Sequence, residues 1–275
     1  MSAPIVETPV PLHPVTTSQK ETMSKLYDST AAAVADIGSG SRLAVGGFGV
    51  CGIPEALINA LAETGATDLE VVSNNCGIDA LGLGVLLNAG RISRIVASYV
   101  GENKEFARRY LSGELEVELT PQGTLAEKLR AGGAGIAAFF TPTGVGTAVA
   151  EGGLPWRYAD DGSIAVSSPA KEVRTFDGRE YVLEEAIRAD YALVHALVAD
   201  TEGNLVFNKA AMNFNPLAAM AGDVCIVQAE QVVPAGTIDP AHVHLPGIFV
   251  DRIVEIGVPV KTIEKRTVAA AEVSA

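Results

Sequence analysis

Residues 42–63, RLAVGGFGVCGIPEALINALAE, predict a short apolar strand, a glycine-rich loop and a helix in succession. Gly47, Gly49 and Gly52 in the loop match the G-x-G-x-x-G spacing of dinucleotide-binding proteins. Glycines let the chain turn sharply and let a ligand approach its N–H groups, and the start of a helix favours negative charge. The loop could therefore hold a pyrophosphate, hold a carbonyl oxygen, or serve only as a turn.

The next strand tests the first of these alternatives. A dinucleotide-binding fold needs an acidic residue at the end of its second strand, where that residue binds the ribose hydroxyls. Here the second strand, residues 69–73, ends at Asn74 and Asn75, whereas Glu70 lies inside the strand and Asp79 lies well beyond it. The sequence therefore disfavours NAD binding, and an NAD-dependent oxidoreductase is kept only as an alternative.

Apolar strands and amphipathic helices alternate along the first half of the chain. This alternation predicts an α/β fold with a mostly parallel open sheet flanked by helices. In residues 114–120 apolar and acidic residues alternate, which indicates a strand with one wet face at an edge of the sheet. The predicted strands are 42–46, 69–73, 93–98 and 114–120, and the predicted helices are 24–37, 54–64, 81–89, 103–111 and 124–131.

The second half of the chain is richer in strands. Residues 141–153 form a glycine-rich connection, and Asp177-Gly178 is a strong signal for a β-hairpin. The sequence contains no internal repeat and no domain linker, so we expect one domain with a β-rich second portion. We further predict a buried strand at 136–140, strands at 190–198, 205–207, 224–229 and 247–253, and a helix at 209–221.

The two ends of the sequence differ in composition from the rest. Residues 1–22 are rich in Pro and Thr and predict a disordered N-terminal extension, without the basic and apolar regions of a secretory signal. The folded domain is expected to span residues 23–262, and residues 263–275 are expected to form a loose tail.

Composition and charge limit the possible partners. Of the 275 residues 48% are hydrophobic, and the formal net charge is −13 with a pI near 4.7. This charge argues against nucleic acid and anionic membrane surfaces as partners, and no apolar run approaches the ~20 residues that span a bilayer. The three cysteines are scattered, which indicates a reducing, cytoplasmic location without a disulfide framework.

The histidines offer a single candidate pair for a metal ion. His242 and His244 are separated by one residue, so a strand there would place both imidazoles on one face. Because the sequence offers neither a third ligand nor a CxxC pattern, we predict no metal site.

Neutral polar groups follow successive predicted strands, at the edge where α/β sheets bind ligands. They lie in residues 46–49, at Asn74 and Asn75, in residues 98–103 and at Gln122. Amides and glycine N–H groups do not transfer protons at neutral pH, but they can donate hydrogen bonds to a developing oxyanion. Taken singly, each could be structural: Asn-Asn is a common turn, and Gln122 could be an exposed loop residue. Their recurrence at successive strand ends favours a site.

No residue stands out as the attacking group. The sequence lacks a G-x-S-x-G elbow, and no Cys–His pair follows from spacing. Glu102 is a candidate carboxylate nucleophile, but Glu102 and Asn103 precede the helix at 103–111, where both residue types serve as caps. We favour the cap. The chain therefore resembles half of an active site, with oxyanion donors and no attacking group.

Several motifs together resemble the family I CoA-transferases. The similarity covers about residues 24–260 and is much more specific than the glycine loop alone. The matching segments are VGGFGVCGIP (45–54), SNN (73–75), SYVGEN (98–103), ELEVELTPQGTLAE (114–127), AGGAG (131–135), TPTG (141–144), KAA (209–211) and NFN (213–215).

The resemblance implies a CoA-transferase-like fold and ping-pong transfer of CoA through a glutamyl-CoA thioester. In the family the nucleophilic Glu lies in a Ser-Glu-Asn-Gly stretch of the other half, which is often a separate B subunit. This chain has Gly101-Glu102-Asn103-Lys104 at a different place, so Glu102 does not inherit that role. The resemblance further implies a heterotetramer of two α and two β subunits, with a CoA thioester as substrate and no permanently bound cofactor.

The resemblance also assigns roles to individual residues. Gln122 matches the oxyanion-side glutamine of the family, and Asn74 and Asn75 match its substrate-side asparagines. The segment Gly46, Gly47, Phe48 and Gly49 matches the wall of the acyl and thioester cleft. The motifs are most similar to alpha (A-type) subunits that use succinyl-CoA and a short 3-ketoacid such as acetoacetate. The alternatives are transferases for 3-oxoadipate or another short acyl group, and non-enzymatic sugar-phosphate sensors of the same fold.

Overall fold

The computed structural model describes residues 24–101 and 103–260. The expected extension at 1–22, the expected tail at 263–275 and the candidate residue Glu102 therefore lie outside the described residues. The expected domain boundaries stay predictions.

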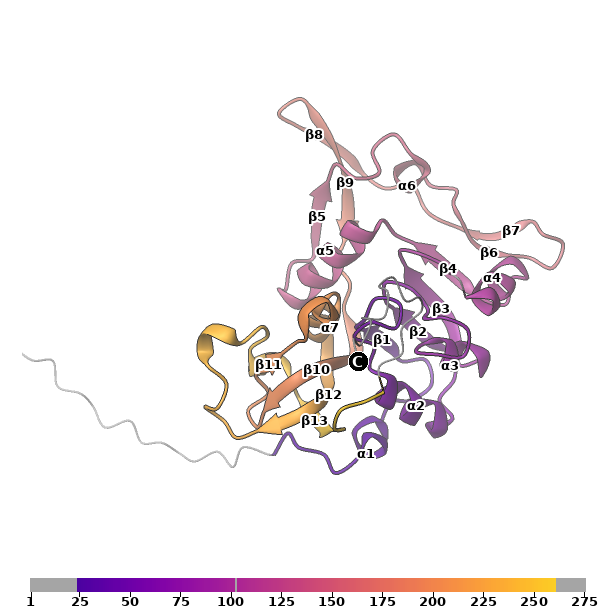
Figure 1. The fold of residues 1–275 in the computed structure, drawn as a ribbon. Coiled ribbons are helices and arrows are strands. Elements are labelled where there is room, and N and C mark those ends of the chain that lie inside the picture. The colour runs from indigo at the N-terminus through magenta and orange to yellow at the C-terminus, as the bar shows by residue number, and fades with distance from the viewer. Residues whose placement is uncertain (1–23, 102, 261–275) are drawn as a thin grey trace, which may run out of the picture.

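A mostly parallel sheet forms the centre of the molecule (Figure 1). Within the described residues it has eight strands, and β11 (Leu205–Val206) pairs antiparallel with β10 while the other neighbours are parallel. This confirms the predicted α/β class, and β4 lies at an edge as its alternating pattern predicts. In spatial order the parallel strands are β13 (Arg252–Glu255), β12 (Gly222–Val233), β10 (Ala189–Asp200), β1 (Arg42–Val45), β2 (Leu69–Val72), β3 (Ile92–Ala97) and β4 (Glu116–Leu119).

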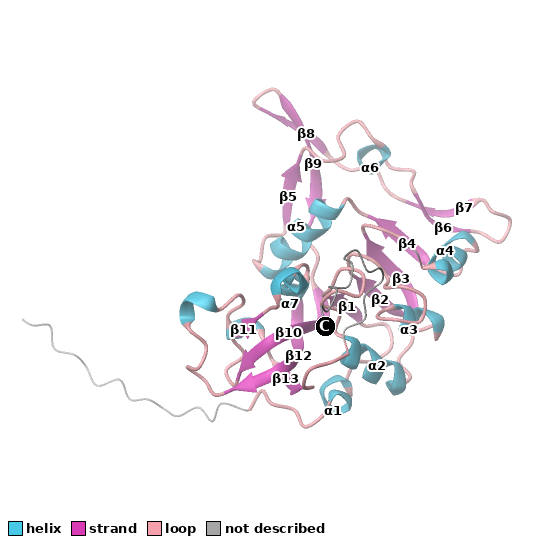
Figure 2. Cartoon of the chain, in the orientation of Figure 1, coloured by secondary structure: helices cyan, strands magenta, loops and turns pink. Residues whose placement is uncertain are grey.

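Helices cover both faces of this sheet (Figure 2). Because side chains alternate along a strand, Leu43 and Val45 pack into one hydrophobic cluster and Ala44 into the other. The first cluster lies under α1 (Thr30–Val34), α2 (Glu55–Thr64), α3 (Gly84–Asn88) and α4 (Lys104–Leu111). The second lies under α5 (Gln122–Gly133) and α7 (Asn215–Ala221).

The order of the strands reverses next to β1. Strands β1 to β4 run outward in one direction, while β10, β12 and β13 extend the sheet in the other. In open α/β sheets, ligands bind outside the carboxyl ends of the strands at such a switch point. The loop after β1 occupies this place.

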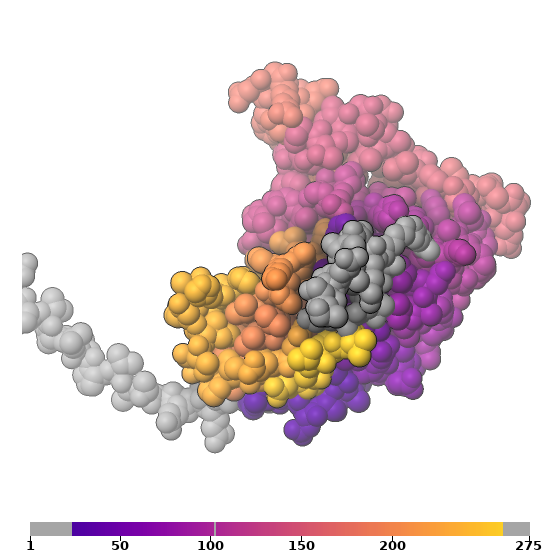
Figure 3. Space-filling view, in the orientation of Figure 1, coloured from indigo at the N-terminus to yellow at the C-terminus, as the bar shows by residue number. Residues whose placement is uncertain are grey.

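Antiparallel sheets form projecting arms in the β-rich second portion. One arm consists of β5 (Ala138–Thr141), β9 (Arg179–Glu185) and β8 (Val173–Phe176), and the other of β6 (Pro155–Tyr158) and β7 (Ile164–Ser167). The β5–β9–β8 arm projects from the body (Figures 1 and 3), whereas β6 lies against α4, where the Tyr110 hydroxyl donates to the Pro155 carbonyl. Asp177 and Gly178 turn between β8 and β9 with φ of 49° and 77°, so the predicted hairpin is confirmed. The connection between the arms contains α6 (Ala148–Glu151).

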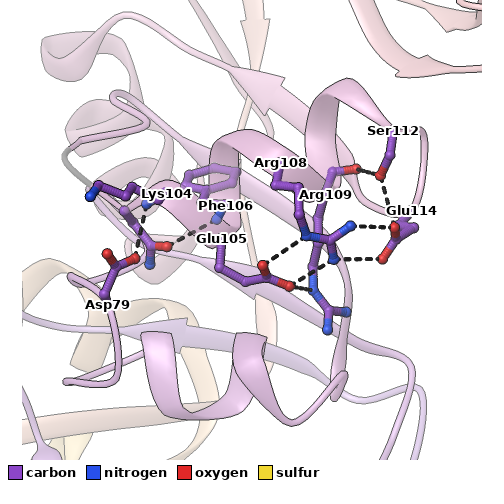
Figure 4. A network of polar contacts seen from close by, with 9 residues as sticks. Asp79, Lys104, Glu105, Phe106, Arg108, Arg109, Ser112 and Glu114 are labelled. Atoms are coloured by element: carbon purple, nitrogen blue, oxygen red, sulfur yellow. Dashed lines mark hydrogen bonds and ion pairs between the residues drawn. The ribbon is translucent and has the colours of Figure 1, made fainter.

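The start of α4 confirms that Asn103 is a helix cap. Its side-chain oxygen accepts a hydrogen bond from the Phe106 N–H at 2.9 Å. Farther along the helix, Arg108 bonds the carboxylates of Glu105 and Glu114 (Figure 4). The guanidinium of Arg108 lowers the pKa of both carboxyls to about 2.

Two predictions near the start and middle of the chain are wrong in part. The helix predicted over 24–37 is limited to α1, because Leu26 bridges to Ile253 and the Tyr27 N–H bonds the Ile253 carbonyl at 2.9 Å. The buried strand predicted at 136–140 becomes β5, which is half-buried and belongs to an arm rather than to the main sheet.

The predicted helix at 209–221 is interrupted. It divides into a 3₁₀ turn, Lys209–Met212, and α7, with Asn213 between them. The Asn213 side chain donates to the Cys51 and Ala210 carbonyls, each at 3.0 Å, and such local bonds compete with the helical ones.

The strand predicted at 247–253 is also wrong in its first half. That half is a second 3₁₀ turn, Gly247–Phe249, and only the end of the predicted range belongs to a strand, β13. A third 3₁₀ turn, Pro240–His242, contains the first histidine of the candidate metal pair.

Candidate active site

The polar residues that follow successive strands converge on one cluster. Asn74, directly after β2, accepts hydrogen bonds at its Oδ1 from Ser98 Oγ after β3 and from Gln122 Nε2 after β4, each at 2.8 Å. Asn75 Oδ1 accepts a hydrogen bond from the Gly49 N–H at 3.2 Å. The contacts join the loop after β1 to the ends of β2, β3 and β4. The convergence expected from the sequence is therefore present.

The members of this cluster differ in exposure. Gln122 is exposed at the first position of α5, so its amide can reach a bound substrate or partner chain. Asn74 is only 1% exposed. An amide buried to that degree acts on a ligand through its neighbours, which distinguishes Asn74 from Gln122.

Two glycines of the loop lie too close to neighbouring residues to carry a side chain. A Cβ on Gly46 would lie 2.0 Å from Asn215 Oδ1. A Cβ on Gly47, which has a φ of 106°, would lie 3.0 Å from the Ile53 Cα. Both glycines are buried, whereas Phe48 is 48% exposed. Gly46 and Gly47 thus allow close packing beneath the loop, and Phe48 lies at the surface.

Asn215 at the start of α7 fixes the loop from below. It is fully buried and accepts a hydrogen bond from the His195 N–H at 2.9 Å. Its amide donates to the carbonyls of Gly52 and Ala211, at 2.9 and 2.8 Å. In the sequence, Asn215 was only part of the NFN motif. No local pattern shows this role, because its partners are far apart in the chain.

A cavity of about 900 Å³ lies beside the loop. Among the described residues, its lining includes Phe48 and Asn75 but neither Asn74 nor Gln122. Tyr99, which is 59% exposed, also lines it. The cavity is large enough for a small acyl group, and its wall combines apolar and polar side chains.

A partly buried imidazole and a buried carboxylate from neighbouring strands face this cavity. His195 of β10 and Glu230 of β12 both line it, and His195 Nε2 lies 3.4 Å from Glu230 Oε1. His195 Nδ1 lies 3.2 Å from the Ile53 carbonyl, which can only accept, so Nδ1 is the donor. Sequence reasoning missed this pair; its only signal was a polar residue inside the apolar run YALVHALV.

The thiols lie in different environments. Burial raises the pKa of the Cys76 thiol to about 12, and it raises the pKa of the Cys225 thiol as well. Cys51 is exposed and lines the cavity. Because the thiolate is the reactive form, Cys51 is the accessible thiol of the three.

The candidate histidine pair for a metal does not lie on a strand. His242 Nδ1 lies 3.3 Å from Asp239 Oδ2, whereas His244 Nδ1 accepts from the Phe207 N–H at 2.9 Å and its ring stacks on Phe207. Over residues 24–101 and 103–260, no group of three or more His, Cys, Asp or Glu side chains could hold a metal ion. In the same ranges, no helix combines the length and the apolar character needed to cross a bilayer.

Comparison with known proteins identifies the family. The family model described as coenzyme A transferase matches residues 27–256. The chain belongs to the coenzyme A transferase family. Membership in this family disfavours the dinucleotide-binding alternative for the chain.

Individual transferases match over most of this chain. A protein of Mycobacterium tuberculosis (strain ATCC 25618 / H37Rv), named as the A subunit of a probable succinyl-CoA:3-ketoacid coenzyme A transferase, is 65% identical over 246 residues, or 90% of this chain and 99% of that protein. Human mitochondrial succinyl-CoA:3-ketoacid coenzyme A transferase 2 is 51% identical over 245 residues, or 89% of this chain and 47% of the human one.

A solved structure supports the fold of this transferase chain. The apoenzyme of an acyl-CoA transferase from Escherichia coli O157:H7 aligns with a TM-score of 0.72 and 24% identity, over 85% of this chain and 47% of that one. This chain thus spans about half the length of the human and the Escherichia coli relatives.

Proposed function

We propose that the chain is the alpha (A-type) component of a two-subunit enzyme that transfers CoA from succinyl-CoA to a 3-ketoacid such as acetoacetate. The observation that carries the proposal is the 65% identity to a protein named as such a component, over 99% of that protein's length. The partner is a B subunit, and two copies of each chain form a heterotetramer. About half of the human relative lies outside the match.

The reaction divides between the two chains. In the B subunit, a glutamate carboxylate attacks the thioester carbonyl of succinyl-CoA, and the resulting tetrahedral oxyanion collapses by expelling the CoA thiolate. The thiolate then attacks the glutamyl carbonyl of the acyl-glutamyl anhydride, which releases succinate and leaves a glutamyl-CoA thioester. The 3-ketoacid carboxylate repeats the sequence in reverse and leaves as its CoA thioester. Each step forms an oxyanion and needs no proton transfer.

This chain supplies hydrogen-bond donors and a wall for the acyl group. One N–H of Gln122 Nε2 is used by Asn74, and the second can donate to the oxyanion. Phe48 and Asn75 line the cavity beside the glycine loop and contact the acyl part of the substrate. Gly46, Gly47 and Gly49 hold the loop in the shape that keeps the cleft open. The CoA thioester is a substrate, and no permanently bound cofactor takes part.

Co-expression with a candidate B subunit tests the proposal. Each chain alone should be inactive, and the purified complex should form acetoacetyl-CoA from succinyl-CoA and acetoacetate. Activity of this chain by itself would overturn the half-site argument, and tight binding of NAD(H) would revive the oxidoreductase alternative. A panel of acceptors distinguishes the substrates: higher kcat/KM with 3-oxoadipate than with acetoacetate would reassign the acceptor.

A further inference from the structure

The amide of Asn74 is held between two neighbouring strand ends. Ser98 Oγ lies 2.8 Å from Asn74 Oδ1 and 3.1 Å from the Asn74 carbonyl oxygen, and its one proton goes to the nearer Oδ1. Gln122 Nε2 donates to the same Oδ1 at 2.8 Å. An amide oxygen offers two lone pairs, so these bonds use its accepting capacity fully. The position of the Gln122 amide therefore depends on the side chain of Asn74, and that of Asn74 depends on Ser98.

The backbone fixes Ser98 in this place. The Ser98 N–H donates to the Asn74 carbonyl at 2.9 Å, and the Thr120 N–H donates to the Ala97 carbonyl at 2.9 Å. These bonds continue the sheet beyond the ends of β2, β3 and β4. These backbone bonds consequently hold the Ser98 hydroxyl beside the Asn74 side chain.

The amide nitrogen of Asn74 lowers the stability of the folded chain. Its Nδ2 is buried and has no hydrogen-bond partner among the described residues. An unpaired buried donor destabilises a protein, and an apolar side chain of similar size would avoid that penalty. The amide oxygen, which receives Ser98 and Gln122, accounts for the presence of an asparagine here.

We propose that Ser98 is a positioning residue for CoA transfer, acting through Asn74 to hold the Gln122 amide toward the reacting carbonyl. This inference rests on the proposed function. Gln122 is an exposed, long side chain at a helix start, and without an anchor it samples several rotamers. Small displacements of a catalytic donor lower the rate more than they lower substrate binding.

Serine substitutions in the complete two-chain enzyme test this role. Ser98→Ala should lower kcat about tenfold with KM changed by less than about twofold, because the donor is misplaced while the binding surface remains. Ser98→Thr keeps the hydroxyl and should restore most of the rate. Ser93→Ala is the matched control: Ser93 is an exposed serine at the start of β3, whose hydroxyl contacts only the Leu69 carbonyl among the described residues, and this variant should match the wild type.

A double-mutant cycle separates positioning from a general structural effect. In a Gln122→Ala background, Ser98→Ala should cause no further loss, since its target is gone. Additive losses, an unchanged rate in Ser98→Ala, or failure of Ser98→Thr to recover activity would each overturn the inference. If the wild-type complex transfers no CoA, the proposed function fails and this inference falls with it; an active wild type with a fully active Ser98→Ala variant rejects the inference alone.

Discussion

Gln122 combines exposure with a defined contact, and this makes it the sharpest single-residue test of the site. Its Nε2 bonds Asn74, while its position at the start of α5 leaves the side chain outside the core. Gln122→Ala should therefore lower kcat about 100- to 1000-fold, the usual cost of losing one oxyanion donor. Steady-state kinetics of the complex with its B subunit measures this loss.

Assembly provides the control for that experiment. Size-exclusion chromatography should show the same complex for Gln122→Ala and for the wild type. Gln231→Ala removes another exposed glutamine, on β12, and should leave kcat unchanged. Equal losses of assembly and activity would mean that Gln122 is structural.

The sequence predicts where the amide donors lie, but it does not predict which of them are buried and which are exposed. Asn74, Asn75 and Gln122 were predicted to converge because the carboxyl ends of parallel strands meet at one edge. Which of them is buried depends on packing from distant elements, and so does the support of the loop by Asn215. Such contacts carry no local periodicity and leave no motif in the sequence.

A buried carboxylate joins the arm formed by β5, β9 and β8 to helix α5 of the body. Glu184 of β9 is 1% exposed and lies 3.4 Å from Lys128 Nζ of α5 and 2.6 Å from Lys171 Nζ. Glu184→Gln would leave Lys171 without its countercharge, whereas Lys128 would keep only Glu118, at 3.5 Å. Because removing one partner of a buried pair leaves an uncompensated charge, we expect the free energy of unfolding to fall by about 3 kcal/mol.

Urea unfolding followed by the fluorescence of Trp156, the sole tryptophan of the sequence, measures this change. Glu172→Gln is the matched control, since its ion pair with Arg174 lies in the same arm with the side chains 46% and 56% exposed. That control should change stability by less than about 0.5 kcal/mol. Similar effects of both substitutions would contradict a special role for the buried carboxylate.

The elements predicted with success are those whose local signals agree with their tertiary surroundings. The Asp177-Gly178 hairpin and the strands β1 to β4 belong to this group. The helix predicted at 24–37 failed over its first residues because backbone pairing of Leu26 with Ile253 competes with the helix. The spacing of its apolar residues is compatible with a helix or with an extended segment, and pairing with the distant strand β13 selects the extended form.

The reversal of strand order explains how the two halves of the chain both contribute to the candidate site. The loop after β1 comes from the first half, whereas Asn215 and His195 beneath it come from the second. Since β10 pairs directly with β1, residues about 150 positions apart are brought together by one pair of neighbouring strands. We expect the proposed B subunit to complete the site at the carboxyl ends of these strands.

A surface ion pair at the far edge of the sheet gives the fold a dependence on pH. Arg252 of β13 bonds both oxygens of Asp36 after α1, at 2.5 and 2.7 Å, and this lowers the pKa of the carboxyl below its ordinary value of 3.8. A carboxyl with a lowered pKa in the folded state stabilises the fold above its unfolded pKa, and this contribution is lost as the pH falls through the folded pKa. The Asp36 side chain is 53% exposed, so we expect the contribution to be below about 1 kcal/mol.

Asp36→Asn should thus unfold at lower urea concentration than the wild type at pH 7, and the difference should shrink as the pH falls below about 4. Asp28→Asn, which removes the same charge from another exposed aspartate near α1, is the control for net charge. Because exposed pairs are screened, 1 M salt should also reduce the difference between Asp36→Asn and the wild type. A difference that persists at pH 2 would show that Asp36 stabilises the molecule through its shape and not through its charge.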